Sequence, residues 1–260
     1  MAPLVFITGA SSGLGQALAV RYHQAGWRLA LVARRGDVLR EWAHAQGWAP
    51  ERFQVYAADV SEVGSIIAAA QACLAQQGLP DVVIANAGIS IGMDTAQRSD
   101  LDVMARTFAV NNLGLAATFH PFVNAMRARG SGHLVGIASV AAIRGLPGHG
   151  AYCASKAGVV SYCESLRGEL RGTGVQVQTI APGFIDTPLT RGNRYPMPFL
   201  MAAPTFADKA FKAIAAGRTY GVIPWQMAVV AKLLRVLPNR WFDRALSGRG
   251  RKAREEPSER

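Results

Sequence analysis

The sequence has few cysteines and lacks the long segments that export or membrane insertion require. Its three cysteines, Cys73, Cys153 and Cys163, are an odd number without the spacing of metal ligands, so we expect neither a disulfide framework nor a metal site. The N-terminus has no basic segment ahead of an apolar one, and no uncharged apolar run reaches the roughly 18 residues that span a bilayer. These absences predict a cytoplasmic protein in a reduced compartment, attached at most to a membrane surface.

Acidic residues are also scarce, because 17 Asp and Glu against 28 Lys and Arg give a net charge of +11. Nine Lys and Arg but only four Asp and Glu lie between Lys232 and Arg260, so about half of the excess belongs to the end of the chain. A basic tail attracts nucleic acid or anionic lipid without specificity, yet solvated charge is its commoner meaning. We expect no specific nucleic-acid partner.

The sequence does contain a regular alternation of short apolar runs and helical patterns. The runs at 4–8, 28–33, 53–58, 81–85, 132–139 and 175–181 are typical of buried strands. Strands that alternate with helices predict the α/β class, with a Rossmann-type doubly wound parallel sheet whose ligand lies at the carboxyl ends of the strands. One domain over residues 1–224 is the simplest fit to this length and a hydrophobic content of 50%.

A glycine-rich turn follows the first predicted strand and precedes a helical pattern. This order of strand, glycine turn and helix is what a dinucleotide site requires. Glycines let the backbone approach a pyrophosphate, and free N–H groups at the helix N-terminus meet its charge. The predicted cofactor contacts in this turn are Gly9, Ser11, Ser12, Gly13, Leu14 and Gly15.

The second predicted strand ends at Ala33, where a chain that prefers NAD usually carries an acid for the ribose hydroxyls. Arg34 and Arg35 follow, and a guanidinium offers a charged planar fork that matches phosphate oxygens. This pattern predicts NADP(H) rather than NAD(H), with Arg34 as the main contact of the 2′-phosphate and Arg35 as a further one. Asp37, which is close enough to be mistaken for the ribose acid, is interpreted as a helix cap.

Ser139, Tyr152 and Lys156 form the most distinctive pattern of the chain. On a helix that begins near Tyr152, a spacing of four places the phenol and the ammonium on one face, one turn apart. A nearby positive charge favours the phenolate, so the spacing predicts a lowered pKa for Tyr152. A decrease of roughly 3 pKa units corresponds to about 4 kcal/mol, which a close ammonium and a cationic cofactor ring together supply.

Six short motifs occur in order between residues 8 and 187. They are T-G-x-x-x-G-x-G from Thr8, N-A-G from Asn86, N-x-x-G from Asn111, the serine Ser139, Y-x-x-x-K from Tyr152, and P-G-x-x-x-T from Pro182 to Thr187. Each motif is weak alone, but their common order resembles the compact single-domain form of the short-chain dehydrogenase/reductase family.

The resemblance implies a role for each matching residue. Tyr152 is the general acid and base, Ser139 positions the substrate oxygen, Lys156 holds the cofactor ribose, and Asn111 maintains a water in the proton relay, with Asn112 as the neighbouring alternative. Asp59 and Val60 are implied to lie beside the adenine. Further implied cofactor contacts are Asn86, Ala87, Gly88, Pro182, Gly183, Ile185 and Thr187.

The implied activity is that of an NADP(H)-dependent oxidoreductase that interconverts a CH–OH and a C=O group on a small-molecule substrate. A carbonyl reductase acting on an apolar substrate is the expectation. The alternative is a non-catalytic NADP(H)-binding regulator or scaffold. The family usually pairs through its helices, so a homodimer or homotetramer is also implied.

The end of the chain is harder to interpret. Residues 188–204 are rich in proline, arginine and methionine and predict a substrate lid. Two interpretations fit its apolar residues: they form the wall of an apolar pocket together with Val140, Ile143 and Leu146, or they are ordinary packing residues. These residues are Tyr195, Met197, Phe199, Leu200 and Met201. Residues 225–248 form a predicted amphipathic extension that covers the substrate, a partner subunit or, through 225–242, a membrane surface. Residues 249–260 predict a disordered basic tail.

Overall fold

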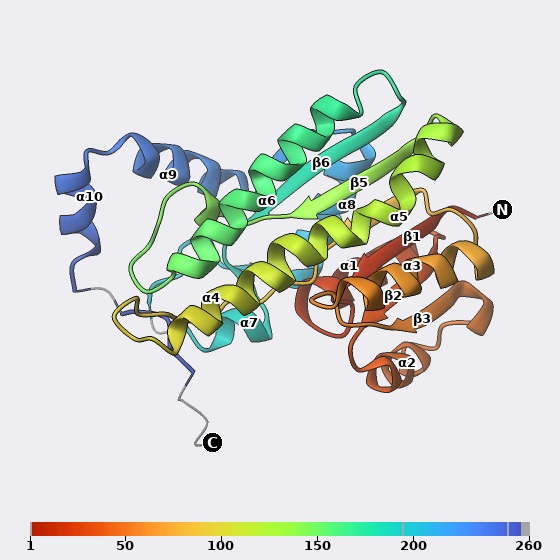
Figure 1. Ribbon diagram of the computed structural model, residues 1–260, viewed down its shortest axis with the longest axis horizontal. Coiled ribbons are helices and arrows are strands. Elements are labelled where there is room, and N and C mark those ends of the chain that lie inside the picture. The colour runs from red at the N-terminus through yellow and green to blue at the C-terminus, as the bar shows by residue number, and fades with distance from the viewer. Residues whose placement is uncertain (1, 194, 249, 256–260) are drawn as a thin grey trace.

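The computed structural model describes residues 2–193, 195–248 and 250–255. Seven parallel strands form one sheet in the order β3-β2-β1-β4-β5-β6-β9 (Figure 1). Their bounds are β1 Leu4–Thr8, β2 Arg28–Ala33, β3 Phe53–Ala57, β4 Val82–Ala85, β5 Gly132–Ile137, β6 Val175–Pro182 and β9 Tyr220–Ile223. The prediction of a doubly wound parallel sheet is confirmed.

The strand order reverses beside β1, which pairs with β2 on one side and with β4 on the other. Chain connections leave β1 and β4 in opposite directions at this point, so a crevice opens at the carboxyl ends of the two strands. The strands are nearly continuous apolar runs because helices cover both faces of the sheet. Every residue of β1 is buried, which fixes the base of the crevice.

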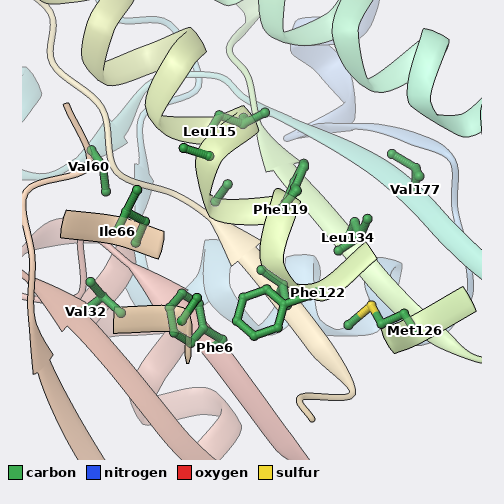
Figure 2. Close-up of a cluster of buried hydrophobic side chains, with 14 of the residues drawn as sticks. Phe6, Val32, Val60, Ile66, Leu115, Phe119, Phe122, Met126, Leu134 and Val177 are labelled. Atoms are coloured by element: carbon green, nitrogen blue, oxygen red, sulfur yellow. The ribbon is translucent and has the colours of Figure 1, made fainter. Parts of the chain in front are cut away.

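Helices α3 (Val63–Gln76), α5 (Gly114–Arg129) and α6 (Gly150–Glu169) cover one face, and α5 and α6 cross it in Figure 1. The core beneath them is aromatic and aliphatic, with the rings of Phe6 and Phe122 packed edge to face at 5.0 Å (Figure 2). Helices α1 (Gly13–Gln24), α2 (Gly36–Ala45) and α8 (Ala203–Ala215) bury a second cluster on the other face. Tight packing on both faces holds the strand ends in fixed positions.

The connection after β4 contains α4 (Asp100–Phe108) and a π-helical turn, Ala109–Leu113, which leads into α5. Short 3-10 turns occur at Pro50–Arg52 and Val140–Ala142. After β6, the short strands β7 (Ile185–Asp186) and β8 (Met201–Ala202) pair in parallel on either side of α7 (Pro188–Arg191). The segment predicted as a substrate lid is therefore anchored at both ends.

Helices α9 (Trp225–Val236) and α10 (Asn239–Leu246) extend from the end of the sheet. Arg144 holds them in place: it donates hydrogen bonds to the carbonyls of Leu234 and Leu237, and its guanidinium lies 3.8 Å from the centre of the Phe242 ring. The outer face of α9 is apolar and open, and Trp225 is 68% exposed. Membrane contact through this segment stays a prediction.

No helix in the part of the chain that the structure describes is long and apolar enough to cross a membrane. The end of the chain differs from the sequence-based expectation. Residues 250–255, predicted as part of a disordered tail, lie against the body of the protein and pair with Gly92, because Asp100 offers a buried carboxylate to Arg254. Residue 249 and residues 256–260 of the predicted tail lie outside the described residues.

Candidate active site

The glycine turn between β1 and α1 forms one end of the site. Gly9 and Gly13 have positive φ angles of 66° and 54°, which glycine adopts without strain. A Cβ atom on Gly9 would lie 2.8 Å from the Cα of Ala87, so the turn leaves no room for a side chain. The first turn of α1 carries no acidic residue, and its free N–H groups make a site for an anion such as a pyrophosphate.

Gly15 has a different role from the other residues of this turn. It does not line the cavity, and a Cβ atom there would lie 2.1 Å from the carbonyl oxygen of Gly9. Gly15 therefore lets α1 pack closely on the turn, which sets the direction of the helix. Thr187 covers the turn from the other side, since a Cβ on Gly13 would lie 3.2 Å from the Thr187 Cβ.

The ends of β2 and β3 carry the charged groups of the site. The side chain of Arg34 is 75% exposed, and its Nη1 lies 3.8 Å from Oδ2 of Asp59. Burial opposes ionisation of Asp59, but hydrogen bonds from Ser61 and the charge of Arg34 lower its pKa. Arg35 does not line the cavity and supplies the N-cap backbone of α2. Asp37, interpreted as a helix cap, lies inside the first turn of α2, so that interpretation was wrong.

Asn86 joins the two strands at which the strand order reverses. Its Nδ2 donates to the carbonyl of Thr8 at 2.9 Å, and the hydroxyl of Thr8 accepts from the backbone N–H groups of Asn86 and Ala87. Thr8 is buried, so these bonds are shielded from water. The network fixes the ends of β1 and β4 relative to each other.

A single cavity of about 920 Å³ runs along the carboxyl ends of the strands. Most of the residues that the sequence predicted to contact a cofactor line it, as does Ser139. The lining members are Gly9, Ser11, Ser12, Gly13, Leu14, Arg34, Asp59, Val60, Asn86, Ala87, Gly88, Tyr152, Lys156, Pro182, Gly183, Ile185 and Thr187. Gly15, Arg35 and Asn111 do not line it.

Tyr152 and Lys156 lie on the first two turns of α6, which begins at Gly150, and Ser139 follows β5 as the N-cap of a 3-10 turn. The Lys156 Nζ lies 5.9 Å from the centre of the Tyr152 ring and donates a 2.8 Å hydrogen bond to the carbonyl of Ile137. Ser139 lines the same cavity as Tyr152 and Lys156. The structure thus brings the serine, phenol and ammonium together, as the spacing indicated.

Burial governs the protonation of this group. It raises the pKa of Tyr152 to about 12, although the neighbouring Ser139 side chain acts in the opposite direction. It lowers the pKa of Lys156 to about 8, because a buried ammonium is poorly solvated. The lowered pKa expected for Tyr152 includes the positive charge of a bound cofactor ring, so it stays a prediction.

Asn111 lies in the π-helical turn, a feature frequently found at functional sites. Its Oδ1 accepts from the N–H of Ile89 at 2.9 Å, and its Nδ2 donates to the carbonyl of Ile89 and to the hydroxyl of Ser155. A Cβ on Gly88 would lie 3.2 Å from the Asn111 Oδ1 and 3.3 Å from the Lys156 Nζ. Asn111, rather than Asn112, is thus the asparagine beside Lys156.

The predicted apolar wall of the lid is placed differently. Phe199 and Leu200 are about half exposed, and Met201 packs on the core beneath α8. Leu189 from α7 and Ile91 from the loop after β4 line the cavity instead. Sequence reasoning also missed Arg106 and Glu255, which line it as well, because no local motif marks either residue.

The described residues hold no cluster of three or more His, Cys, Asp or Glu side chains suited to a metal ion. The reactive groups of the site are the Tyr152 phenol, the Ser139 hydroxyl and the Lys156 ammonium, which line the same cavity as the glycine turn. This arrangement is suited to proton transfer to or from an oxygen bound next to Tyr152.

A sequence model of the family described as short chain dehydrogenase matches residues 3–197. The chain belongs to this family of oxidoreductases. An uncharacterized oxidoreductase of Myxococcus xanthus is 40% identical over 92% of this chain and 94% of its own length.

Two further proteins are similar to this chain. A 2-(R)-hydroxypropyl-CoM dehydrogenase of Xanthobacter autotrophicus is 33% identical over 74% of this chain and 78% of its own length. The crystal structure of a short-chain dehydrogenase/reductase from Burkholderia phymatum in complex with NAD is 27% identical, has a TM-score of 0.81 and covers 99% of this chain and 98% of that one.

Proposed function

We propose that this chain interconverts a carbonyl group and a primary or secondary alcohol on an apolar substrate, using NADP(H) and Tyr152 as the general acid and base. The observation that carries the proposal is that Tyr152, Ser139 and Lys156 line the same cavity as the glycine turn of α1. A phosphate cradle and a proton donor in one cleft suit a nicotinamide cofactor next to a substrate oxygen. The dehydrogenase name of the Xanthobacter relative is in keeping with alcohol chemistry.

The residues present fit such a cofactor. Gly9 and Gly13 leave the space that a Cβ would fill, and the N-terminus of α1 faces that space with unopposed N–H groups. Asp59 and Val60 would hold the adenine end, while Lys156 and Asn86 would hold the other ribose. When bound, the nicotinamide supplies or accepts the hydride, and side chains of the protein donate or accept the proton.

In the reductive direction, Tyr152 donates its phenolic proton to the substrate oxygen while Ser139 donates a hydrogen bond to the same atom. The bond from Tyr152 to its proton breaks as the product O–H bond forms, which leaves a phenolate. The ammonium of Lys156, one helical turn away, stabilises that phenolate, and a proton returns through the polar groups around Asn111. A pKa of about 12 keeps Tyr152 protonated at neutral pH, as donation requires.

The preference for NADP(H) rests on Ala33 and Arg34. No carboxylate occupies the end of β2, and the exposed guanidinium of Arg34 lies at the lip of the cavity, where it suits a 2′-phosphate. The structural relative from Burkholderia was solved with NAD, so the comparison of NADPH with NADH is the direct test of this preference.

The apolar character of the substrate rests on the side chains that line the cavity beyond Tyr152. Ile89, Ile91 and Leu189 are aliphatic and partly exposed to this space. Aliphatic walls with a few polar groups at one point are the usual composition of a small-molecule site.

The test is the rate of NADPH consumption by the purified protein with a panel of apolar ketones and aldehydes. Tyr152→Phe removes the proton donor and leaves the ring, so turnover is expected to fall at least a hundredfold while NADPH binding stays within about threefold. Near-normal turnover in this variant would remove Tyr152 from the mechanism. Tight NADPH binding without turnover on any compound would favour the regulatory or scaffold alternative.

A further inference from the structure

The end of the chain returns to the cavity, where Glu255 is one of the lining residues. Residues 250–255, called the strap below, run past the loop ahead of α4 and past α7, as the last described part of the chain in Figure 1 shows. The backbone of Gly92 donates a 3.0 Å hydrogen bond to the carbonyl of Ala253, and Gly92 forms a parallel bridge with Arg254. The strap therefore adds a short β-type pairing to the loop that follows β4.

Two glycines make room for the strap. A Cβ atom on Gly92 would lie 2.3 Å from the carbonyl oxygen of Lys252 and 2.6 Å from that of Ala253, so no other residue fits there without displacing the strap. Gly148, in the loop before α6, has a φ of 76°, and a Cβ there would meet the side chain of Arg251 at 3.0 Å. The strap thus lies directly against the loops that flank Tyr152.

Asp100 and Arg254 fix the strap at its far end. Asp100, the first residue of α4, is only 3% exposed, and its carboxylate accepts from Nε and Nη2 of Arg254 at 2.6 and 2.9 Å. It also accepts from the N–H of Asp94 at 2.7 Å. A buried carboxylate with a bidentate guanidinium partner is a specific contact, unlike an exposed ion pair. The hydrogen bond from Arg254 helps to hold the pKa of Asp100 at about 2.

The strap also contacts the segment after β7, where Leu189 lines the cavity. The Lys252 Nζ donates to the carbonyl of Leu189 at 2.9 Å and to the Oδ1 of Asn193 at 2.8 Å, both in the segment after β7. Glu255 forms an ion pair with Arg106 of α4, and both residues line the cavity. One short segment therefore joins the loop after β4, helix α4 and helix α7 across the opening.

We propose that the strap is the outer wall of the substrate site, and that the Asp100–Arg254 pair sets which substrates enter by holding this wall closed. The proposal rests on the proposed function, since it assigns the substrate limit of that same site. With the wall in place, the cavity admits compact carbonyl compounds. When the pair is broken, the mouth widens and bulky compounds gain access.

An accessibility experiment tests the strap without any need for turnover. The native cysteines are all buried, so a single cysteine introduced as Ile91→Cys, next to Gly92, reports on the space behind the strap. We expect a maleimide carrying a 5 kDa polyethylene glycol to label it at least tenfold faster when Arg254→Ala or Gly92→Ala is added. Arg244→Ala, which changes an exposed arginine of α10, should leave the rate unchanged. Equal rates in all four proteins would overturn the proposal.

A substrate comparison then tests specificity in the full chain without the added cysteine. The ratio of kcat/KM for a four-ring steroid ketone to that for cyclohexanone is expected to rise at least tenfold in Arg254→Ala and Asp100→Asn. Arg254→Lys, which keeps one charged contact, should give an intermediate ratio, and Arg244→Ala the original one. An unchanged ratio in the variants would overturn the specificity role. Absence of turnover in every protein would instead contradict the proposed function, and the labelling rates would still decide whether the strap closes the cavity.

Discussion

Replacing Lys156 by methionine is expected to change the stability of this protein in a way that depends on pH. The side chain is 4% exposed, and burial lowers its pKa from 10.5 to about 8. Below pH 8 the amine is protonated in both the folded and the unfolded state, so burial of its charge destabilises the fold by a constant amount. Since one pKa unit is worth about 1.4 kcal/mol, that amount is about 3 kcal/mol.

The destabilisation disappears as the pH rises from about 8 to 10.5. In this range the unfolded state still binds the proton and the folded state has lost it, so the free energy of unfolding increases with pH. The free energy of unfolding of the wild type minus that of Lys156→Met should therefore be flat below about pH 7.5. Between pH 7 and pH 10 it should rise by about 2 to 3 kcal/mol.

A second effect offsets the first at neutral pH. Methionine leaves the carbonyl of Ile137 without the 2.8 Å hydrogen bond from Lys156, which costs about 1 to 3 kcal/mol for a buried acceptor. The variant is thus expected to match the wild type within about 2 kcal/mol at pH 7 and to be clearly less stable at pH 10.

Urea unfolding followed by circular dichroism at several pH values measures this difference. Lys232→Met is the matched control, because Lys232 is exposed on α9 and its replacement should give a difference that stays flat across the range. A flat difference for Lys156→Met, or one that falls as the pH rises, would refute the argument that burial governs the protonation of this lysine.

Three further predictions concern other parts of the chain. Arg34→Ala should raise the Kd of NADPH about 10- to 100-fold with little effect on the Kd of NADH. Arg35→Ala, which changes a residue outside the cavity, should leave both dissociation constants within about threefold. Equal effects of the two variants would contradict the assignment of Arg34 to the 2′-phosphate. Gly15→Ala should lower the midpoint of thermal unfolding by several degrees, because the added Cβ would meet the Gly9 carbonyl. Gly64→Ala is the control: Gly64 has open space around it in α3, so this variant should not lower the midpoint. Trp225→Ser should reduce retention on phosphatidylglycerol vesicles in co-sedimentation if the exposed face of α9 contacts anionic membranes, and equal retention would exclude that contact.

The fold and most of the cavity were predictable because they depend on local patterns. Apolar runs such as Leu4–Thr8 form buried strands wherever helices cover both faces, and the glycines that follow have backbone angles that few other residues adopt. The spacing of Tyr152 and Lys156 requires only a helix. Each of these features is decided by residues within a few positions of one another.

The features that the sequence did not reveal depend on contacts between distant segments. Arg254 meets Asp100 across more than 150 residues, and neither residue belongs to a motif, so the end of the chain has the composition of a solvated tail. The hydrogen bonds from Arg144 to the backbone at the end of α9 are likewise visible only in three dimensions. Burial of Tyr152, which raises the pKa of its phenol, is likewise not reported by local spacing.

The opposite shifts of Tyr152 and Lys156 have one cause and favour one chemical role. Burial disfavours charge on either group, so the phenol holds its proton more firmly and the ammonium loses its proton more readily. At neutral pH Tyr152 is therefore in its acid form and Lys156 is mostly protonated, which are the states that the proposed function requires of a proton donor and of the group that stabilises its phenolate. Action as a base requires further positive charge near the phenol. Under the proposed function, the rate of carbonyl reduction is therefore expected to fall, and that of alcohol oxidation to rise, as the pH increases.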